Sequence, residues 1–235
     1  MLPRDSFIHP WSGKPVEALL FDLDGTLVDS APDIATAIND VLSSEGLAEL
    51  DVPTVRTLIG EGIRRLTEKA FAIRGNALSS NDLDSKAAAF SEKYASCIAD
   101  RTAPMPGVIE GLAGLRQAGF KTAVVSNKAQ GLTEQLLEQI QLTQFFDYIQ
   151  GAQAALAPKP APDMVRAALS NLKCTPDVAA FVGDSSIDVA TGAASSLPVF
   201  LLKGGYTGGA ELPEGAFQVF QDFHGLVSWI QERDG

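Results

Sequence analysis

Strand-like and helix-like segments alternate along the second half of the chain, and this alternation limits the possible fold more than any other feature. Short apolar runs predicted as strands lie at residues 121–125, 148–150, 179–182, 199–202 and 217–220. Amphipathic stretches predicted as helices lie between and after them, at residues 108–118, 132–140, 162–172, 187–194 and 224–231. This order is typical of a parallel sheet with helices on both faces.

An earlier apolar run belongs to the same sheet. Ala18 to Phe21 is continuously apolar, as a buried parallel strand is, and Asp22, Asp24 and Gly25 follow it directly. Ligand sites in open α/β sheets lie just beyond the carboxyl ends of strands. Two carboxylates at that place are costly to bury without a cation or a shared proton. The alternative is an ordinary acidic turn, because Asp-Gly is a common turn pair.

Between these two parts the pattern is helical only. Helices are predicted at residues 31–45, 55–59, 63–73 and 83–99, with Ser80, Asn81 or Asp82 as the cap of the last one. The predicted fold class is therefore α/β, a doubly wound, Rossmann-like parallel sheet with an inserted all-helical domain. We expect residues 1–29 and 101–235 to form the α/β domain and residues 30–100 to form the helical insertion.

Charge and composition exclude several kinds of protein. The 29 acidic residues outnumber the 18 basic ones and give a net charge of −11, which argues against general nucleic-acid binding but leaves a small anionic substrate open. No apolar run reaches the roughly 20 residues of a membrane span. Cys97 and Cys174 stand outside any metal-binding cluster, which favours a reducing cytosol. Residues 1–17 are predicted to form a leader arm and not a signal peptide, so we expect a cytoplasmic location.

Polar side chains follow two further strands and occupy one stiff loop. Ser126 and Asn127 end the strand at 121–125, and Asp184 and Asp188 follow the strand at 179–182. Lys159 lies between two prolines. In a doubly wound sheet these segments can converge on the two acids that follow the first strand.

These motifs together resemble those of the haloacid dehalogenase superfamily of phosphatases. Asp22-x-Asp24-x-Thr26 is similar to its first motif and Ser126 to its second, while Lys159 is similar to the third and Gly183-Asp184-x-x-x-Asp188 to the fourth, in the same order. The helical insertion resembles the cap domain that this superfamily carries between its first and second motifs.

The resemblance implies a chemistry for each residue. Asp22 is expected to attack phosphorus and form an aspartyl-phosphate, and Asp24 is expected to protonate the leaving alcohol and later activate water. Mg²⁺ is the implied cofactor, held by Asp22, by the backbone carbonyl of Asp24 and by Asp184, with Asp188 supporting the ion or binding it through water. The expected phosphate-binding groups are Ser126, the N–H of Asn127 and Lys159.

Structural roles remain open for several of these residues. Thr26 could only shape the turn after Gly25, and Ser126 could only cap the next helix. Lys159 could be solvated, as most lysines are, and Asp188 could be an ordinary helix residue.

Within the superfamily, the sequence most resembles the phosphoglycolate phosphatases, through residues 21–33 and 58–62. The second segment resembles their substrate loop, which makes Thr26, Gly60, Glu61, Gly62 and Arg64 candidate substrate residues.

An acid at Asp24 argues against halide removal, because a halide leaves without a proton. Alternatives are a sugar phosphomutase similar to β-phosphoglucomutase, a nucleotidase, and, from another class, a non-catalytic phosphate-binding module. The substrate, the oligomeric state (monomer or dimer) and the order of residues 1–16 stay open.

Overall fold

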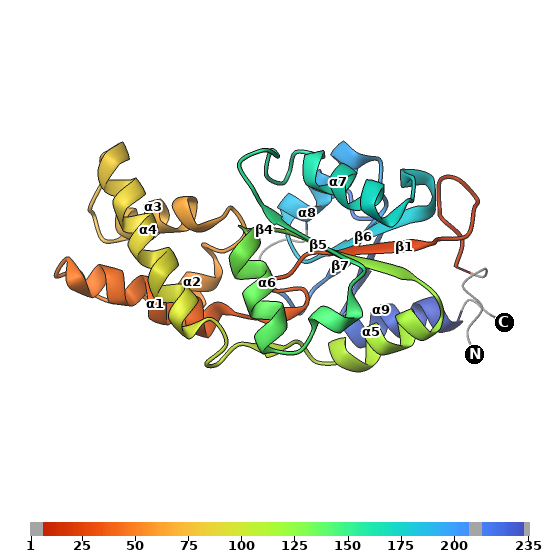
Figure 1. Ribbon diagram of the computed structural model, residues 1–235, viewed down its shortest axis with the longest axis horizontal. Helices are drawn as coiled ribbons and strands as arrows, with labels where there is room; N and C mark the ends of the chain where they lie inside the picture. The colour runs from red at the N-terminus through yellow and green to blue at the C-terminus, as the bar shows by residue number, and fades with distance from the viewer. Residues whose placement is uncertain (1–6, 207–212, 233–235) are drawn as a thin grey trace.

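A computed structural model describes residues 7–206 and 213–232, and its sheet follows the predicted order (Figure 1). The strands lie in the order β5-β4-β1-β6-β7-β8, and every neighbouring pair is parallel. The strands are β1 (Ala18–Phe21), β4 (Lys121–Ala129), β5 (Tyr148–Ala152), β6 (Ala179–Gly183), β7 (Val199–Leu202) and β8 (Gln218–Phe220). The predicted α/β class is confirmed.

Helices cover both faces of this sheet because the buried strands carry apolar side chains on both sides. Leu19 and Phe21 belong to one apolar cluster and Leu20 to the other, as the period of two along a strand requires. The first cluster includes side chains of α5 (Val108–Gln117), α6 (Gln130–Gln139) and α9 (Phe223–Glu232), and the second those of α7 (Asp163–Leu172) and α8 (Ser186–Ser195). Short 3-10 turns, η2 (Thr143–Phe145) and η3 (Pro176–Val178), precede β5 and β6.

The helical insertion stands at one end of the sheet (Figure 1). It contains α1 (Ala31–Ser44), α2 (Val52–Arg56), α3 (Ile63–Ile73) and α4 (Ser80–Cys97). A short antiparallel pair, β2 (Val28–Asp29) with β3 (Ala103–Pro104), joins the two chain segments that connect it to the sheet. The predicted division at residues 30 and 100 stays a prediction.

Two helix starts in the insertion differ from the prediction. The predicted start of α2 at residue 55 is wrong, because Asp51 accepts a hydrogen bond from the N–H of Thr54 and so begins the helix at Val52. The predicted caps of α4 are wrong as well, because Ser79 accepts the hydrogen bond from the N–H of Asp82. The cap of α2 lies four residues before the predicted helix start, and the cap of α4 lies directly before the first predicted cap residue, Ser80.

β4 is longer than predicted and irregular in its last part. Its pairing with β5 shifts register between Val125 and Ala129, so Ser126 and Asn127 lie where regular pairing has ended. Ala129 occupies the N-cap position of α6, so Ser126 does not cap that helix.

Part of the predicted leader arm packs against the α/β domain. Phe7 is only 1% exposed, and its ring contacts those of Phe120, Phe200 and Trp229. Aromatic side chains of this size dominate core energetics, so residues 7–16 form part of the fold. Residues 1–6 lie outside the described residues.

A buried carboxylate ties together the two connecting segments. Asp33, on α1, is 1% exposed and accepts hydrogen bonds from the N–H groups of Arg101 and Thr102 and from Thr102 Oγ1, the last two at 2.7 Å. Hydrogen bonds to a charged acceptor are about twice as strong as neutral ones. Asp33 therefore fixes the return segment beside the start of α1.

We expect Asp33→Ala to lower the free energy of unfolding by about 3 kcal/mol, because it leaves the N–H of Arg101 and the buried N–H and Oγ1 of Thr102 without this acceptor. Urea unfolding followed by circular dichroism measures the change. The matched control is Asp40→Ala on the same helix, whose exposed ion pair with Lys93 should contribute less than about 1 kcal/mol. A loss no larger than that of the control would contradict this role of Asp33.

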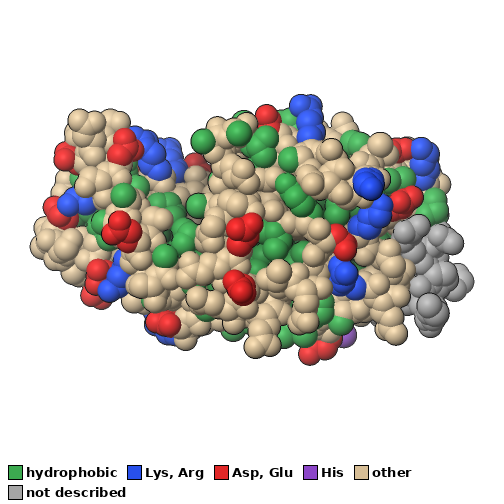
Figure 2. Space-filling model, in the orientation of Figure 1, with side chains coloured by type: hydrophobic (Ala, Val, Ile, Leu, Met, Phe, Trp, Pro, Cys, Tyr) green, Lys and Arg blue, Asp and Glu red, His purple; other side chains and the backbone are tan. Residues whose placement is uncertain are grey.

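Charged side chains of both signs are interspersed over the face shown in Figure 2, and they do not gather into one basic area there. Among the described residues, no helix combines the length and apolarity that crossing a membrane requires.

Candidate active site

The turn after β1 brings two acids to the end of the sheet. The N–H of Asp22 donates to the carbonyl of Val182 at 2.9 Å, so Asp22 still follows the line of the strand. Gly25 then turns the chain with a φ of +87°, and a Cβ atom there would lie 2.6 Å from Asp184 Oδ2. Only glycine fits this turn without displacing Asp184.

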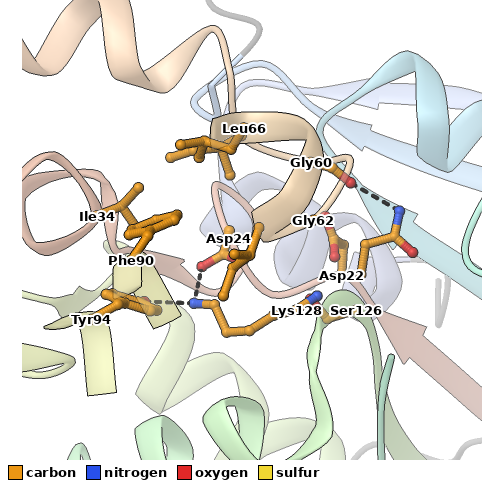
Figure 3. A pocket seen from close by; sticks show the side chains of 13 residues that line it. Asp22, Asp24, Ile34, Gly60, Gly62, Leu66, Phe90, Tyr94, Ser126 and Lys128 are labelled. Carbon is orange, nitrogen blue, oxygen red and sulfur yellow. Dashed lines mark hydrogen bonds and ion pairs between the residues drawn. The ribbon is translucent and has the colours of Figure 1, made fainter. Parts of the chain in front are cut away.

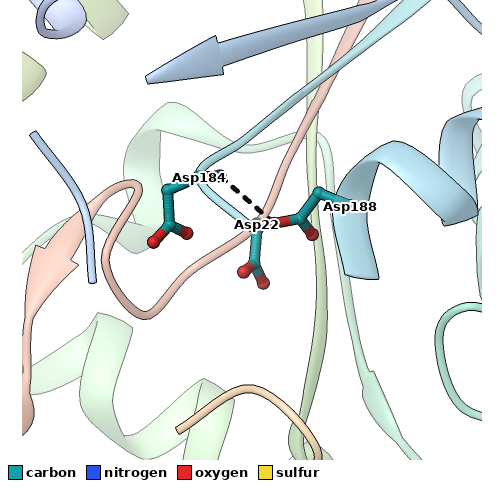
Figure 4. Close-up of side chains that lie close together, drawn as sticks. All are labelled: Asp22, Asp184 and Asp188. Atoms are coloured by element: carbon teal, nitrogen blue, oxygen red, sulfur yellow. Dashed lines mark hydrogen bonds between the residues drawn. The ribbon is translucent and has the colours of Figure 1, made fainter. Parts of the chain in front are cut away.

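Three buried carboxylates meet at this point. Asp22, Asp184 and Asp188 each offer an oxygen within 4.8 Å of the others, and we call them the acid cluster (Figure 4). Thr26 Oγ1 donates to Asp184 Oδ1 at 3.0 Å, and the N–H of Tyr206 donates to Oδ2 at 2.7 Å. Thr26 therefore does more than shape the turn, since it orients one member of the cluster.

Asp188 is held on both of its carboxylate oxygens. Oδ2 accepts from the N–H groups of Asp184 and Ser185 and from Ser185 Oγ, which forms a capping box at the start of α8. Oδ1 accepts from Lys159 Nζ at 2.8 Å. Asp188 is thus a buried structural and electrostatic partner, and not an ordinary helix residue.

Lys159 is the cation of this cluster and is not solvated. Its Nζ lies 2.8 Å from Asp22 Oδ1 and 2.8 Å from Asp188 Oδ1. Burial by itself lowers the pKa of Lys159, but the carboxylates of Asp188 and Asp22 raise it by more. Lys159 therefore stays charged.

One ammonium does not balance three carboxylates. Burial, and next the charge of Asp188, raise the pKa of Asp22 to about 7. The same two causes raise the pKa of Asp184 well above its ordinary value. Ionised carboxylates in such a place need a further cation, and their oxygens suit a hard ion such as Mg²⁺. The donor set present therefore fits the expected metal.

Asn127 joins three parts of the site through its side chain. Its Nδ2 donates to the carbonyls of Gly60, at 2.9 Å, and Lys159, at 3.0 Å, and its Oδ1 accepts from the N–H of Lys159 at 2.8 Å. The neighbouring Ser126 is buried, and its Oγ accepts from the N–H of Lys128 at 3.2 Å. Asn127 thereby links the loop of the helical insertion to the loop that carries Lys159.

Asp24 has partners that the sequence analysis missed. Its Oδ1 lies 2.6 Å from Lys128 Nζ and 2.5 Å from Ser30 Oγ. Lys128 Nζ also donates to Tyr94 OH, on α4, at 2.8 Å (Figure 3). The only sequence signal for Lys128 was its place directly after Ser126 and Asn127, and Tyr94 had none.

Tyr206 is a further site residue that was not predicted from the sequence. Its hydroxyl accepts from the N–H groups of Ser30, at 2.7 Å, and Ala31, at 2.9 Å, and lies 3.1 Å from Asp29 Oδ1. Its own N–H holds Asp184. Tyr206 therefore connects the acid cluster to the first segment that leads into the helical insertion.

A cavity lies between the acids and the helical insertion. Its volume is about 460 Å³, including the open mouth. Asp22, Asp24, Ser126, Asn127 and Lys128 line it from the α/β domain, and the insertion contributes Ile34, Ile59, Gly60, Gly62, Ile63, Leu66, Phe90 and Tyr94.

The predicted substrate residues divide into two groups. Gly60 and Gly62 line the cavity, as Figure 3 shows. Arg64 is directed elsewhere, since its Nε donates to Asp84 at 2.7 Å on an exposed surface. Glu61 pairs with Lys69 and Arg65. The structure thus brings together the predicted catalytic, phosphate-binding and metal residues, but it does not bring Thr26, Glu61 or Arg64 to the cavity wall.

Comparison with known proteins gives consistent results. Residues 19–202 match the family described as haloacid dehalogenase-like hydrolase. The chain is 38% identical to a phosphoglycolate phosphatase of Caulobacter vibrioides, covering 86% of this chain and 84% of that one. It is 36% identical to one of Rhodospirillum rubrum, covering 91% and 90%. A crystal structure of a predicted phosphoglycolate phosphatase from Haemophilus somnus superposes with a TM-score of 0.82 at 27% identity, covering 92% of this chain and 98% of that one.

Proposed function

Because the chain belongs to the haloacid dehalogenase-like hydrolases, we propose that it is a Mg²⁺-dependent phosphatase for a small phosphate monoester such as 2-phosphoglycolate. One observation carries the proposal: Asp22 lies on the wall of a small cavity, in contact with Lys159 and close to the other acids, with Asp24 two residues away. The names of the two relatives support the choice of substrate.

In the first half-reaction an oxygen of Asp22 attacks phosphorus. A bond forms between this oxygen and phosphorus, the bond from phosphorus to the ester oxygen breaks, and Asp24 gives its proton to the departing alcohol. Lys159, Ser126 and the N–H of Asn127 hold the phosphoryl oxygens. The product of this step is an aspartyl-phosphate.

In the second half-reaction Asp24 takes a proton from water as the water attacks phosphorus. The bond between Asp22 and phosphorus breaks, and inorganic phosphate leaves. Asp22, Asp184 and the backbone carbonyl of Asp24 would hold Mg²⁺. Both oxygens of Asp188 are already engaged, which favours its supporting role. Bound Mg²⁺ would supply positive charge for the phosphoryl oxygens.

The experiment is a panel of phosphate monoesters assayed for phosphate release with Mg²⁺ and with a chelator. We expect 2-phosphoglycolate to be among the best substrates, and the chelator to abolish turnover until Mg²⁺ is returned. In the same samples Mg²⁺ at about 100 times its Kd should stabilise the fold by about 2.7 kcal/mol, seen as a higher Tm.

Other results would identify a different function. Isomerised sugar phosphate with little free phosphate would indicate a phosphomutase, and a nucleotide as the best substrate would indicate a nucleotidase. Mg²⁺-dependent ligand binding without turnover would indicate a non-catalytic binding module. A cytoplasmic location remains a prediction, as does the absence of nucleic-acid binding.

A further inference from the structure

We propose that Lys128 binds a second anionic group of the substrate, a carboxylate close to the phosphate ester, and so restricts the site to phosphorylated carboxylic acids. The inference rests on the proposed phosphatase function and adds the residue that selects the substrate class. From the sequence we expect substrate selection in the segment from Gly60 to Arg64, but the structure directs Arg64, the only basic candidate there, away from the cavity.

The ammonium of Lys128 is held firmly inside the site. Lys128 is 7% exposed, its Nζ contacts Asp24 Oδ1 at 2.6 Å and Tyr94 OH at 2.8 Å, and the residue lines the cavity. An ammonium carries three N–H donors, so these two contacts leave one for a ligand oxygen. Figure 3 shows these two contacts of the ammonium.

Within the part of the chain that the structure describes, the cavity wall offers no second positively charged donor for an anion. Lys128 is the only lysine or arginine among the described residues that line the cavity. The part contributed by the helical insertion is mostly apolar, with Ile34, Leu66 and Phe90 prominent in Figure 3. A carboxylate moved from water to such a surface needs a charged donor, which makes Lys128 the expected partner.

The arrangement separates the two anionic ends of a small substrate. Lys159 pairs with Asp22 and Asp188, whereas Lys128 pairs with Asp24. A phosphoryl group at Asp22 therefore has Lys159 beside it, and the group attached to the ester oxygen extends past Asp24 toward Lys128. Asp22, Asp24 and Lys128 line the same cavity, so one small molecule can contact all three.

The test compares 2-phosphoglycolate with 2-hydroxyethyl phosphate, a monoester in which a neutral hydroxymethyl group replaces the carboxylate. In the wild-type protein we expect kcat/KM to be higher for 2-phosphoglycolate. Lys128→Met should lower kcat/KM for 2-phosphoglycolate by about 100-fold. The loss for the neutral ester should be at least tenfold smaller, because only 2-phosphoglycolate loses an ion pair. Lys128→Arg should restore part of the preference.

A surface lysine provides the matched control. Lys93→Met removes the same charge from α4, one residue from Tyr94, and should leave both substrates unchanged. If Lys128→Met does not fold, Tyr94→Phe tests the same point, since it releases the ammonium on one side and should reduce the preference several-fold.

The outcomes are decisive in either direction. Equal losses on both esters would mean that Lys128 only positions Asp24, and the proposal would be wrong. An unchanged preference, or a wild-type protein without preference, would overturn it too. Failure of the phosphatase function looks different, because then the wild-type protein hydrolyses neither ester. In that case binding of 2-phosphoglycolate, measured by calorimetry with wild type and Lys128→Met, tests the carboxylate contact alone.

Discussion

Asp22→Asn is expected to lower kcat for phosphate monoesters by about 10⁴-fold or more, because it removes the nucleophile and with it the covalent intermediate. Asparagine has nearly the shape of aspartate, so Lys159 and the cavity wall keep their places. Phosphate release under saturating substrate and Mg²⁺ measures the loss. Mass spectrometry of acid-quenched samples should find a phosphoryl adduct on the Asp22 peptide of the wild type and none in the variant.

Stability separates this effect from damage to the fold. Burial raises the pKa of Asp22 to about 7 above an ordinary value of 3.8, so the ionised side chain is disfavoured in the folded, metal-free protein. At pH 8 this penalty is fully present, since the pH lies above both values, and the neutral Asn variant lacks it. We therefore expect Asp22→Asn to have a Tm no lower than that of the wild type at pH 8 without metal.

A control of equal charge completes the experiment. Asp40→Asn makes the same change on an exposed part of α1 and should leave kcat unchanged. More than a tenth of the wild-type kcat in Asp22→Asn would contradict the nucleophilic role. A normal kcat with a lowered Tm would assign Asp22 to stability alone.

The sequence predicted those parts of the site that depend on strand ends. Asp22 and Asp184 follow apolar runs directly, and the parallel order of the sheet brings those runs side by side. Lys159 was recognisable because prolines flank it. A short pattern along the chain is enough for such residues, since the fold class dictates that strand ends of this kind converge.

Site residues that are placed by long-range packing could not be predicted from the sequence. Tyr94 lies in the last turn of α4 with a spacing that fits any core position, and its hydrogen bond to Lys128 depends on how the helical insertion meets the sheet. Tyr206 follows two glycines, and its contacts with Ser30 and Asp184 span distant segments. Arg64 was predicted at the site but does not lie there. Its side chain, at the start of a helix, pairs with Asp84 instead.

Lys159→Met is expected to lower the free energy of unfolding of the metal-free protein by about 3–5 kcal/mol. Methionine has a similar length but no charge, so Asp22 and Asp188 would face each other inside the protein without their cation. Breaking a buried ion pair from one side costs this much because the partner charge stays buried. Urea unfolding in a chelator measures the loss, and Lys93→Met is the matched surface control.

A second substitution distinguishes charge from packing. Adding Asp188→Asn removes one of the two uncompensated carboxylates, while the amide oxygen can still accept from the N–H groups of Asp184 and Ser185. If charge is the cause, the double variant should recover at least about 1 kcal/mol of the loss, a coupling of the size found between directly contacting residues. If the cause is instead the lost contact of Lys159 Nζ with the Phe181 ring, no recovery is expected.

Mg²⁺ should offset the excess negative charge that Lys159→Met leaves among the buried carboxylates. A divalent cation at the acid cluster supplies the positive charge that Lys159→Met removes, so Mg²⁺ should raise the Tm of this variant by more than that of the wild type. Activity should not return with stability, because the ammonium is also expected to hold a phosphoryl oxygen during transfer. If Mg²⁺ restores both the stability and the activity of the variant, Lys159 serves only to balance the charge of the carboxylates. If Mg²⁺ does not change the Tm of the variant, the ion binds elsewhere than at Asp22 and Asp184.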